Sequence, residues 1–140
     1  MSKIQHQERM NKVVQFIEGH LDEQLNVRYL SNLAYYSQFH FHRLFRSYIG
    51  ESVYAYRKRL LLERAVKQLL HSSSAITDIA FDAGYNNQAS FNKAFKNQYY
   101  CSPSELRKKG VSNQQQSSNL TIERNVDMKP TIKDIEAING

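Results

Sequence analysis

Two stretches of the chain combine cations, amides and imidazoles with aromatic rings and contain no acidic residue. The first covers residues 36–50 and reads YSQFHFHRLFRSYIG, and the second covers residues 86–99 and reads NNQASFNKAFKNQY. An exposed helix usually mixes Glu with Lys or Arg, because each such pair adds a few tenths of a kcal/mol. A face without acids forgoes this gain, which makes sense where phosphate groups supply the negative charge. Both stretches are therefore candidates for a DNA-facing surface, against the simpler interpretation of an ordinary solvated face.

The outer face of each stretch would carry the side chains that read base edges in the major groove of DNA. Arg and Lys suit guanine, Gln and Asn suit adenine, and an apolar ring suits the thymine methyl group. The predicted base contacts are Gln38, Phe39, His42 and Arg43 in the first stretch and Asn87, Gln88, Asn92 and Lys93 in the second. Phosphate contacts are predicted for two helix starts and two cations, namely Ser37, Asn86, Arg46 and Lys96. The basic triplets at 57–59 and 107–109 either contact phosphate or lie in solvent.

A metal site or an active site is the competing chemical interpretation. His40 and His42 are two residues apart, so on a helix they point about 200° apart, whereas a zinc pair needs a spacing of four. The single Cys101 excludes a Cys-rich zinc site and an internal disulfide, and it favours a reducing cytoplasm. Because no acid pair or Ser/His/Asp arrangement is present, we predict no metal, no cofactor and no enzymatic activity.

Charge and length restrict the class of protein. The 140 residues include 19 Lys plus Arg and 13 Asp plus Glu, and the excess lies in residues 1–110, which hold 16 basic and 9 acidic groups. A basic domain of this size suits a nucleic acid or an anionic membrane as partner. The amino end is polar, and the longest aliphatic run is three leucines, so neither an export signal nor a membrane span is expected.

The elements that would position these stretches are helices. Apolar residues recur at helical spacing, and only two prolines are present, both after residue 102. We predict helices over about 7–20, from Val27 onward with Asn26 as cap, from Ser37 to Gly50, and from Ser52 to about Leu70. The last helix should bury Val53, Tyr56, Leu60, Ala65 and Leu69.

The helical pattern occurs twice. At an offset of 49 residues Val27 matches Ile76 and Tyr36 matches Tyr85, and at an offset of 50 Phe45 matches Phe95. The second copy ends in SPSE at 102–105, which is typical of a helix start because it combines a serine cap, a first-turn proline and a capping-box glutamate. The chain therefore holds one helical unit twice.

Residues 8–109 resemble the DNA-binding domain of the AraC/XylS family of bacterial transcription regulators. The second copy carries the family pattern, here Ile76, Ile79, Ala80, Gly84, Tyr85, Ser90, Phe91, Lys93, Phe95, Lys96, Ser102, Pro103 and Arg107. The resemblance implies an all-α domain over 1–110, with about seven helices. It would hold helix-turn-helix copies at about 7–50 and 71–110, recognition helices at 38–48 and 87–98, and a connecting helix at about 52–70.

The sequence departs from this family at three positions. Lys93 stands where the family usually has Arg, which replaces a two-pronged guanine contact by a point charge. Tyr35 occupies the place of the turn glycine that Gly84 provides in the second copy, and Tyr100 replaces a glycine after the second recognition helix. We expect each tyrosine to cost about 1 kcal/mol of strain.

The expected function is that of a transcription regulator that binds specific sequences of double-stranded DNA. A connecting helix of 19 residues spans about 28 Å, close to the turn of about 34 Å in B-DNA, so two recognition helices could enter successive major-groove segments. The alternatives are an adaptor whose acid-free faces bind an acidic protein, or a non-specific nucleic-acid-binding module. RNA polymerase is a further expected partner.

The composition changes after residue 110. Residues 111–119 read VSNQQQSSN, which predicts a flexible linker. Residues 120–140 show an interrupted two-residue alternation that hints at one strand, and they form a tail or the start of a further domain. As in members of the family with a carboxyl-side ligand domain, an effector could act through a domain beyond residue 140.

Overall fold

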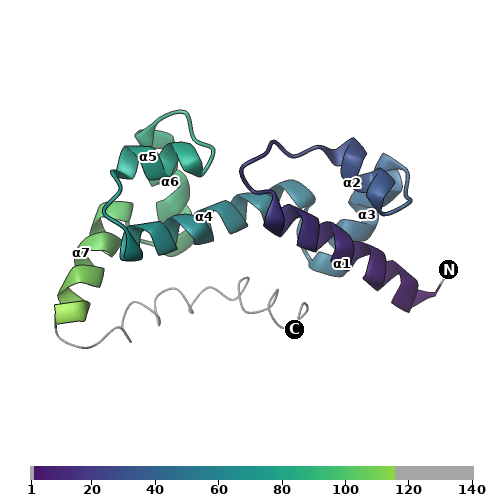
Figure 1. Ribbon diagram of the computed structural model, residues 1–140, viewed down its shortest axis with the longest axis horizontal. Coiled ribbons are helices and arrows are strands. Elements are labelled where there is room, and N and C mark those ends of the chain that lie inside the picture. The colour runs from purple at the N-terminus through teal and green to yellow at the C-terminus, as the bar shows by residue number, and fades with distance from the viewer. Residues whose placement is uncertain (1, 116–140) are drawn as a thin grey trace. The chain divides into compact units, whose positions relative to one another are not determined.

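The computed structural model describes residues 2–115, and this part of the chain is built from seven α-helices without a strand (Figure 1). The helices are α1 (Lys3–Gly19), α2 (Val27–Leu33), α3 (Gln38–Ile49), α4 (Val53–His71), α5 (Ile76–Asp82), α6 (Gln88–Tyr99) and α7 (Pro103–Gln115). The chain forms two compact units that divide within α4, the first ending at Leu60 and the second beginning at Leu61. The prediction of an all-α fold with seven helices is confirmed.

Side-chain caps start the helices of the first unit where the sequence predicts them. The backbone N–H of Tyr29 donates to Asn26 Oδ1 at 3.0 Å, and the N–H of His40 donates to Ser37 Oγ at 3.2 Å. Ser52 caps α4 in the same way. The first helix begins four residues earlier than predicted, because Ser2 forms a capping box with Gln5 and the helix can start at Lys3.

The core of the first unit lies between α1, α2, α3 and the first half of α4. Phe41 and Phe45 of α3 are fully buried, and the Phe45 ring lies 5.7 Å from that of Tyr56. The other buried members include Met10, Val13, Val14, Ile17, Leu30, Ala34, Ile49 and Val53. Burial of these apolar side chains is the main contribution that holds the short helix α2 in place.

The second unit repeats this core with the second half of α4 and with α5, α6 and α7. Phe91 and Phe95 are fully buried, and the other members include Leu61, Leu62, Ala65, Val66, Leu69, Ile79, Ala80, Tyr99 and Leu106. The order of buried, half-buried and exposed residues over 91–100 is identical to that over 41–50. This identity confirms the repeat at an offset of 50. The expectation that Leu60 is buried was wrong. Leu60 is only half buried, whereas Leu61 and Leu62, which follow it, lie in the core.

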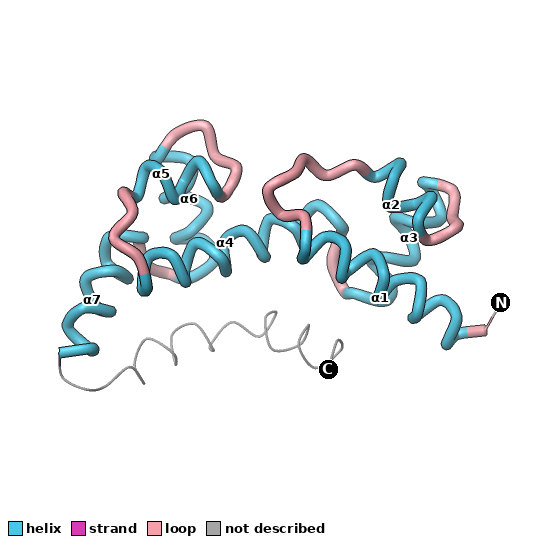
Figure 2. The backbone as a smooth tube through the Cα atoms, viewed as in Figure 1, coloured by secondary structure: helices cyan, strands magenta, loops and turns pink. Residues whose placement is uncertain are grey.

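Each unit has two left-handed residues, one in the loop before α3 or α6 and one at the end of that helix. Figure 2 shows these loops in pink. In the first unit these are Tyr35 with φ of 62° and Gly50 with φ of 93°. In the second unit they are Gly84 with φ of 92° and Tyr100 with φ of 63°. The predicted strained tyrosines are thus confirmed as left-handed, and glycine and tyrosine exchange places between the units.

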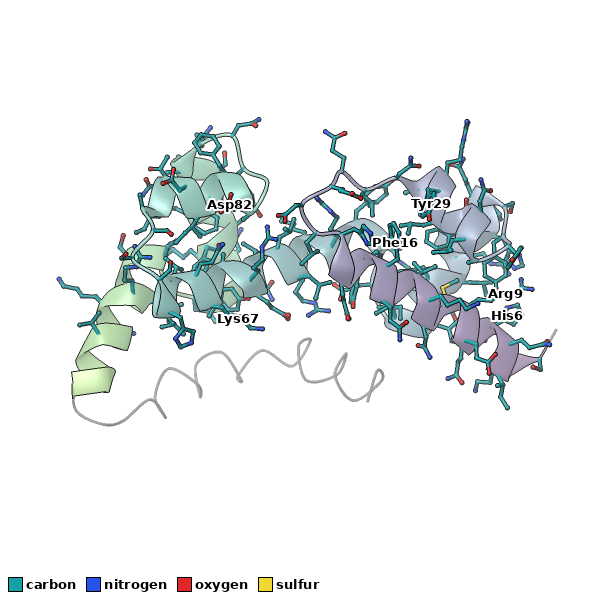
Figure 3. All side chains as sticks on the ribbon, in the orientation of Figure 1. His6, Arg9, Phe16, Tyr29, Lys67 and Asp82 are labelled. Carbon is teal, nitrogen blue, oxygen red and sulfur yellow. The ribbon has the colours of Figure 1, made fainter. Side chains whose placement is uncertain are left out.

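Arg9 holds the strained turn of the first unit. Its guanidinium lies 5.2 Å from the centre of the Tyr35 ring and 5.3 Å from that of Tyr36, and it donates a hydrogen bond to the Ala34 carbonyl at 3.3 Å. Figure 3 shows Arg9 on the first half of α1, next to His6, whose ring nitrogen is hydrogen-bonded to the Tyr36 hydroxyl. Cation–π contacts of this kind contribute about 0.5–1 kcal/mol at partly exposed sites.

Two equivalent arginines fasten the loop that precedes each helix-turn-helix. Arg57 donates to the carbonyl oxygens of Leu21 and Glu23, at 3.1 and 2.7 Å. Arg107 donates to three carbonyl oxygens, those of Leu69, Ser72 and Ser74, at 2.7–3.2 Å. Both residues begin the basic triplets for which phosphate contact or solvent exposure was expected, and both guanidinium groups are bonded to the protein instead of lying free in solvent.

The third residue of the first triplet also binds a side chain of the protein. Arg59 is 5% exposed, and its Nε lies 3.0 Å from Glu51 Oε2. By contrast, Lys58, Lys108 and Lys109 are exposed, so only these members of the two triplets face solvent.

The last described helix extends further than the composition suggests. α7 continues to Gln115, so the predicted linker over 111–119 begins inside a helix, because glutamine is a fair helix former and no proline lies between Gly110 and Gln115. The predicted strand-like segment over 120–140 lies outside the described residues. Cys101 is buried at the start of the turn before α7, and burial raises the pKa of its thiol.

None of the helices described over residues 2–115 is both long and apolar enough to pass through a lipid bilayer. Within residues 2–115, no three His, Cys, Asp or Glu side chains lie close enough to share a metal ion.

Candidate nucleic-acid interface

Helix α3 buries one stripe and presents the other to solvent. Phe41, Phe45 and Ile49 face the core. Every side chain predicted to touch DNA from this helix lies on the remaining surface, with Gln38, Phe39, Arg43 and Arg46 exposed and His42 half buried. Phe39 is 77% exposed. The predicted face of α3 is therefore one continuous surface.

His42 is held against the start of α4. Its ring lies 5.8 Å from the ring of Tyr54 at an angle of 26°, in a stacked arrangement. Tyr54 is itself 59% exposed, so the pair extends the surface of α3 toward solvent. No sequence pattern indicates this stack, because the turn between α3 and α4 decides which aromatic residue meets position 42.

Helix α6 begins one residue later than predicted, and its cap is Asn87 instead of Asn86. The backbone N–H of Ser90 donates to Asn87 Oδ1 at 2.8 Å, and Asn87 is extended, as a cap residue must be. Two consecutive asparagines suit the cap equally well by type, so the sequence alone could not choose between them. As a consequence the amide oxygen of Asn87 is already bonded, whereas Asn86 is exposed one residue before the cap.

The other predicted contacts of α6 differ in exposure. Lys93 and Lys96 are exposed, while Gln88 and Asn92 are half buried. The Gln88 amide oxygen accepts a hydrogen bond from Thr77 Oγ1 of α5 at 3.0 Å. The Asn92 amide oxygen is enclosed, with no hydrogen-bond partner among the described residues. Asn92 thus cannot accept from a base through that oxygen in the conformation seen here.

One exposed position of α6 was missing from the prediction. Ala89 is equivalent to Phe39 at the offset of 50 and is exposed on the same side of its helix. Its small apolar side chain carries no chemical signal in the sequence, although the repeat register identifies it.

Several arginines outside α3 and α6 bind the protein itself. Arg9, Arg57, Arg59 and Arg107 do so through the contacts described above, and Arg64 donates to the Asp82 carbonyl at 2.8 Å. The four cations of α3 and α6, namely Arg43, Arg46, Lys93 and Lys96, form no ion pair with any described acidic residue. Their charge is available to an external anion, while the core of each unit keeps the helix that carries them rigid.

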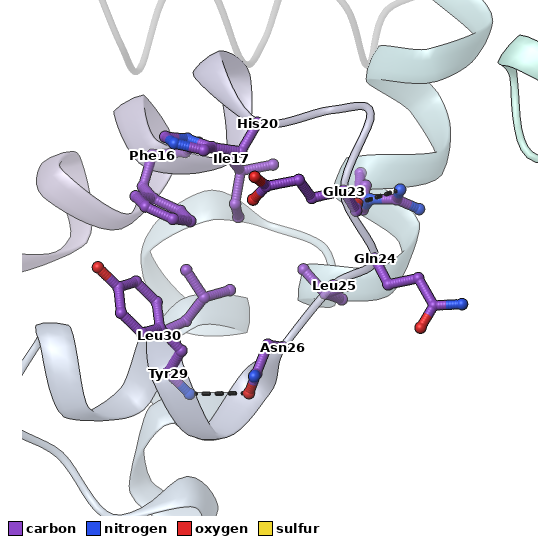
Figure 4. A pocket seen from close by; sticks show the side chains of 10 residues that line it. Phe16, Ile17, His20, Glu23, Gln24, Leu25, Asn26, Tyr29 and Leu30 are labelled. Atoms are coloured by element: carbon purple, nitrogen blue, oxygen red, sulfur yellow. Dashed lines mark hydrogen bonds between the residues drawn. The ribbon is translucent and has the colours of Figure 1, made fainter.

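The first unit also contains a pocket of about 290 Å³ (Figure 4). It lies between α1, α2 and the loop that joins them, and its lining includes Phe16, whose ring stacks on His20 at 3.8 Å and tilts toward Tyr29 at 4.9 Å. Arg57 contributes to the lining through the guanidinium that binds the loop carbonyls. None of the predicted DNA contacts lines this pocket, so it is separate from the α3 surface.

Known proteins share this arrangement. A family model described as a helix-turn-helix domain matches residues 30–109. The regulatory protein SoxS of Escherichia coli K12 is 32% identical over 104 residues, which cover 73% of this chain and 95% of SoxS. An uncharacterized HTH-type transcriptional regulator of Bacillus subtilis, YbfP, is 33% identical over 102 residues, but this chain spans only 35% of its length.

Solved structures agree with these relatives. A transcriptional regulator of Chromobacterium violaceum, described as an AraC-type DNA-binding domain-containing protein, superposes with a TM-score of 0.69 at 25% identity, covering 74% of this chain and 93% of that one. The DNA-binding domain of AdpA, solved in complex with a target DNA, gives a TM-score of 0.68 at 26% identity, covering 76% and 96%. The match extends over more than half of the chain and nearly all of SoxS, and the chain belongs to the AraC/XylS family of bacterial transcription regulators.

Proposed function

We propose that this chain is a transcription regulator that binds specific sequences of double-stranded DNA through α3 and α6. One observation carries the proposal: each of these helices presents, on an acid-free face, exposed cations that form no ion pair with a described acidic residue, while Arg57, Arg64 and Arg107 are bonded within the protein. The AdpA domain, which shares this fold, was solved with a target DNA, and this supports the same kind of partner here. Regulators of this family are in general not enzymes, and the proposed role needs no catalytic step.

The proposed roles follow from exposure and chemistry. In the first unit, Arg43 would bind guanine through two parallel hydrogen bonds, with Gln38 and His42 on neighbouring base edges and Phe39 against a thymine methyl group. In the second unit we propose Gln88, Asn92 and Lys93 as base contacts, with Asn92 acting through its amide nitrogen. Asn87, which was predicted as a base contact, caps α6, and we propose for it a place near the phosphates instead, because the start of a helix of twelve residues favours an anion.

Phosphate contacts would fix the position of each unit on the duplex. We propose Arg46 and Lys96 for this role, together with the helix starts at Ser37 and Asn86. The two helices would occupy successive major-groove segments, so that one chain reads two half-sites about one helical turn apart.

Further partners are proposed with the same function. A regulator that activates transcription touches RNA polymerase while it is bound to DNA, and an effector would act through a domain beyond residue 140. The proposed function places the chain with the chromosome, in the bacterial cytoplasm.

Selection of bound duplexes from a random pool, at a stated salt concentration, tests the function. We expect two conserved half-sites, and an affinity that falls with salt with a slope of several units. Lys67→Ala removes an exposed charge outside α3 and α6 and serves as the control, which should select the same site. If the bound duplexes show no sequence preference, the chain is a non-specific nucleic-acid-binding module. If duplex DNA does not displace an acidic protein partner, the adaptor is favoured.

A further inference from the structure

The second unit contains a hydrogen bond between the two helices of its helix-turn-helix that the first unit lacks. Thr77, in the first turn of α5, donates from its hydroxyl to the side-chain oxygen of Gln88, the first residue of α6, at 3.0 Å. Thr77 is exposed and Gln88 is half buried. The bond therefore lies at the edge of the surface that the proposed function assigns to DNA.

The bond changes what Gln88 offers to a base. A glutamine amide has one oxygen that accepts and one NH₂ group that donates, and it reads adenine by using both at once, toward N6 and N7. The Thr77 bond takes one of the two lone pairs of that oxygen and holds the oxygen toward α5, so the group left for an incoming base is the NH₂ donor. Guanine, with acceptors at N7 and O6, and thymine, with an acceptor at O4, fit a donor better than adenine does.

The first unit provides an internal comparison. Gln38 is the equivalent glutamine at the start of α3, and Arg28 stands at the position equivalent to Thr77. Gln38 is exposed, and its side chain has no hydrogen-bond partner among the described residues. The two glutamines at equivalent places in the repeat are thus held in different ways. The Gln38 amide is free to turn, and the Gln88 amide is oriented by Thr77.

We infer that Thr77 is a positioning residue for base recognition: it orients the Gln88 amide so that the second unit prefers guanine or thymine over adenine at the base pair that Gln88 meets. The inference rests on the proposed function, because it presupposes a specific duplex site. Thr77 acts through Gln88 and needs no contact with the base itself.

The test compares base preference among variants of the full chain. Gln88→Ala first identifies the base pair, which is the one whose preference it flattens in duplexes selected by the unaltered chain. Thr77→Val removes the hydroxyl and retains the branched shape, and binding to duplexes with each base at that pair should show adenine gaining on guanine by roughly threefold to tenfold, the value of one neutral hydrogen bond. Thr77→Ser keeps the hydroxyl and should keep the original preference.

Two controls separate specificity from folding. Ser73→Ala removes an exposed hydroxyl that bonds to no described residue and should change nothing. The thermal midpoint of Thr77→Val shows whether the second unit is still folded. An equal loss of affinity of this variant for all four bases would reveal a structural role and overturn the inference.

The remaining outcomes are also decisive. An unchanged preference in Thr77→Val, or a Gln88→Ala variant that flattens no base pair although the unaltered chain selects a site, would overturn the inference and leave the proposed function standing. A chain that selects no site at all would instead reject the proposed function, and the inference with it.

Discussion

The two units bury the same positions and expose different chemistry. Over residues 41–50 and 91–100 the order of buried and exposed side chains is the same, with phenylalanines at the two fully buried positions. The outer face differs, however. At the offset of 50, Phe39, His42 and Arg43 of the first unit correspond to Ala89, Asn92 and Lys93 of the second. The comparison teaches that the two units share the buried stripe and differ on the outer face, where the proposed function places the contacts with DNA.

The largest effect should come from the shared core. Phe45→Ala and Phe95→Ala each remove a fully buried ring, which typically lowers the free energy of unfolding by about 3–5 kcal/mol. If the units are equivalent in packing, the two losses should agree within about 1 kcal/mol in urea titrations followed by circular dichroism. A loss of less than about 1 kcal/mol in one unit only would break the equivalence.

The outer faces should respond unequally to the loss of one cation. Arg43→Ala should weaken binding to the selected duplex by about 1–3 kcal/mol and relax the preference at one base pair, because an arginine can grip guanine with two bonds. Lys93→Ala should weaken binding to all duplexes more evenly, since lysine acts as a point charge. Titrations with matched and single-substituted duplexes measure both effects, and Arg43→Ala with unchanged preference would remove the assignment.

The loop-fastening arginines should affect stability and not base preference. Arg107→Ala breaks three hydrogen bonds to carbonyl oxygens and Arg57→Ala breaks two, so we expect losses of about 2 and 1 kcal/mol in the free energy of unfolding. Lys108→Ala, which removes an exposed charge next to Arg107, is the control and should leave the thermal midpoint unchanged. Unaltered stability with a lower salt slope of DNA binding would instead assign these arginines to phosphate.

The exchange of glycine and tyrosine at the left-handed positions gives the smallest effects. Tyr100→Gly relieves a positive φ and should stabilise the chain by up to about 1 kcal/mol. Tyr35→Gly relieves the same strain but removes the ring on which Arg9 stacks, so its net effect should be near zero. Differential scanning calorimetry measures both, with Gly84→Ala as the reverse change, which should cost about 1 kcal/mol from backbone strain alone because its Cβ has room. Equal stabilisation by the two Tyr→Gly variants would show that the Arg9 contact contributes nothing.

Features that depend on local chemistry were predictable from the sequence. Asn26 and Ser37 were identified as caps from their type and their place before an apolar pattern, and Gly50 as a helix end from its freedom to adopt positive φ. The positive φ at Tyr35 and Tyr100 was expected from the family pattern, in which both residues stand at glycine positions.

Features that depend on which side chains meet in space were not predictable. Arg57 and Arg107 lie in basic triplets that resemble a phosphate-binding surface, yet they bind carbonyl groups of a loop more than 30 residues away in the chain. Neither composition nor spacing reveals that the loop passes within reach of the guanidinium. The contact between Thr77 and Gln88 escaped prediction for the same reason, because it depends on how α5 crosses α6.

The buried Cys101 is a native probe for opening of the second unit. Thiol-modifying reagents attack the thiolate, and burial both shields the Cys101 sulfur and raises its pKa, so alkylation of the closed molecule should be slow. The sequence has no other cysteine, so the rate of labelling at a fixed pH measures how often the second unit opens, without any engineered probe. Bound duplex should lower the rate of Cys101 labelling if it stabilises the closed form of the second unit.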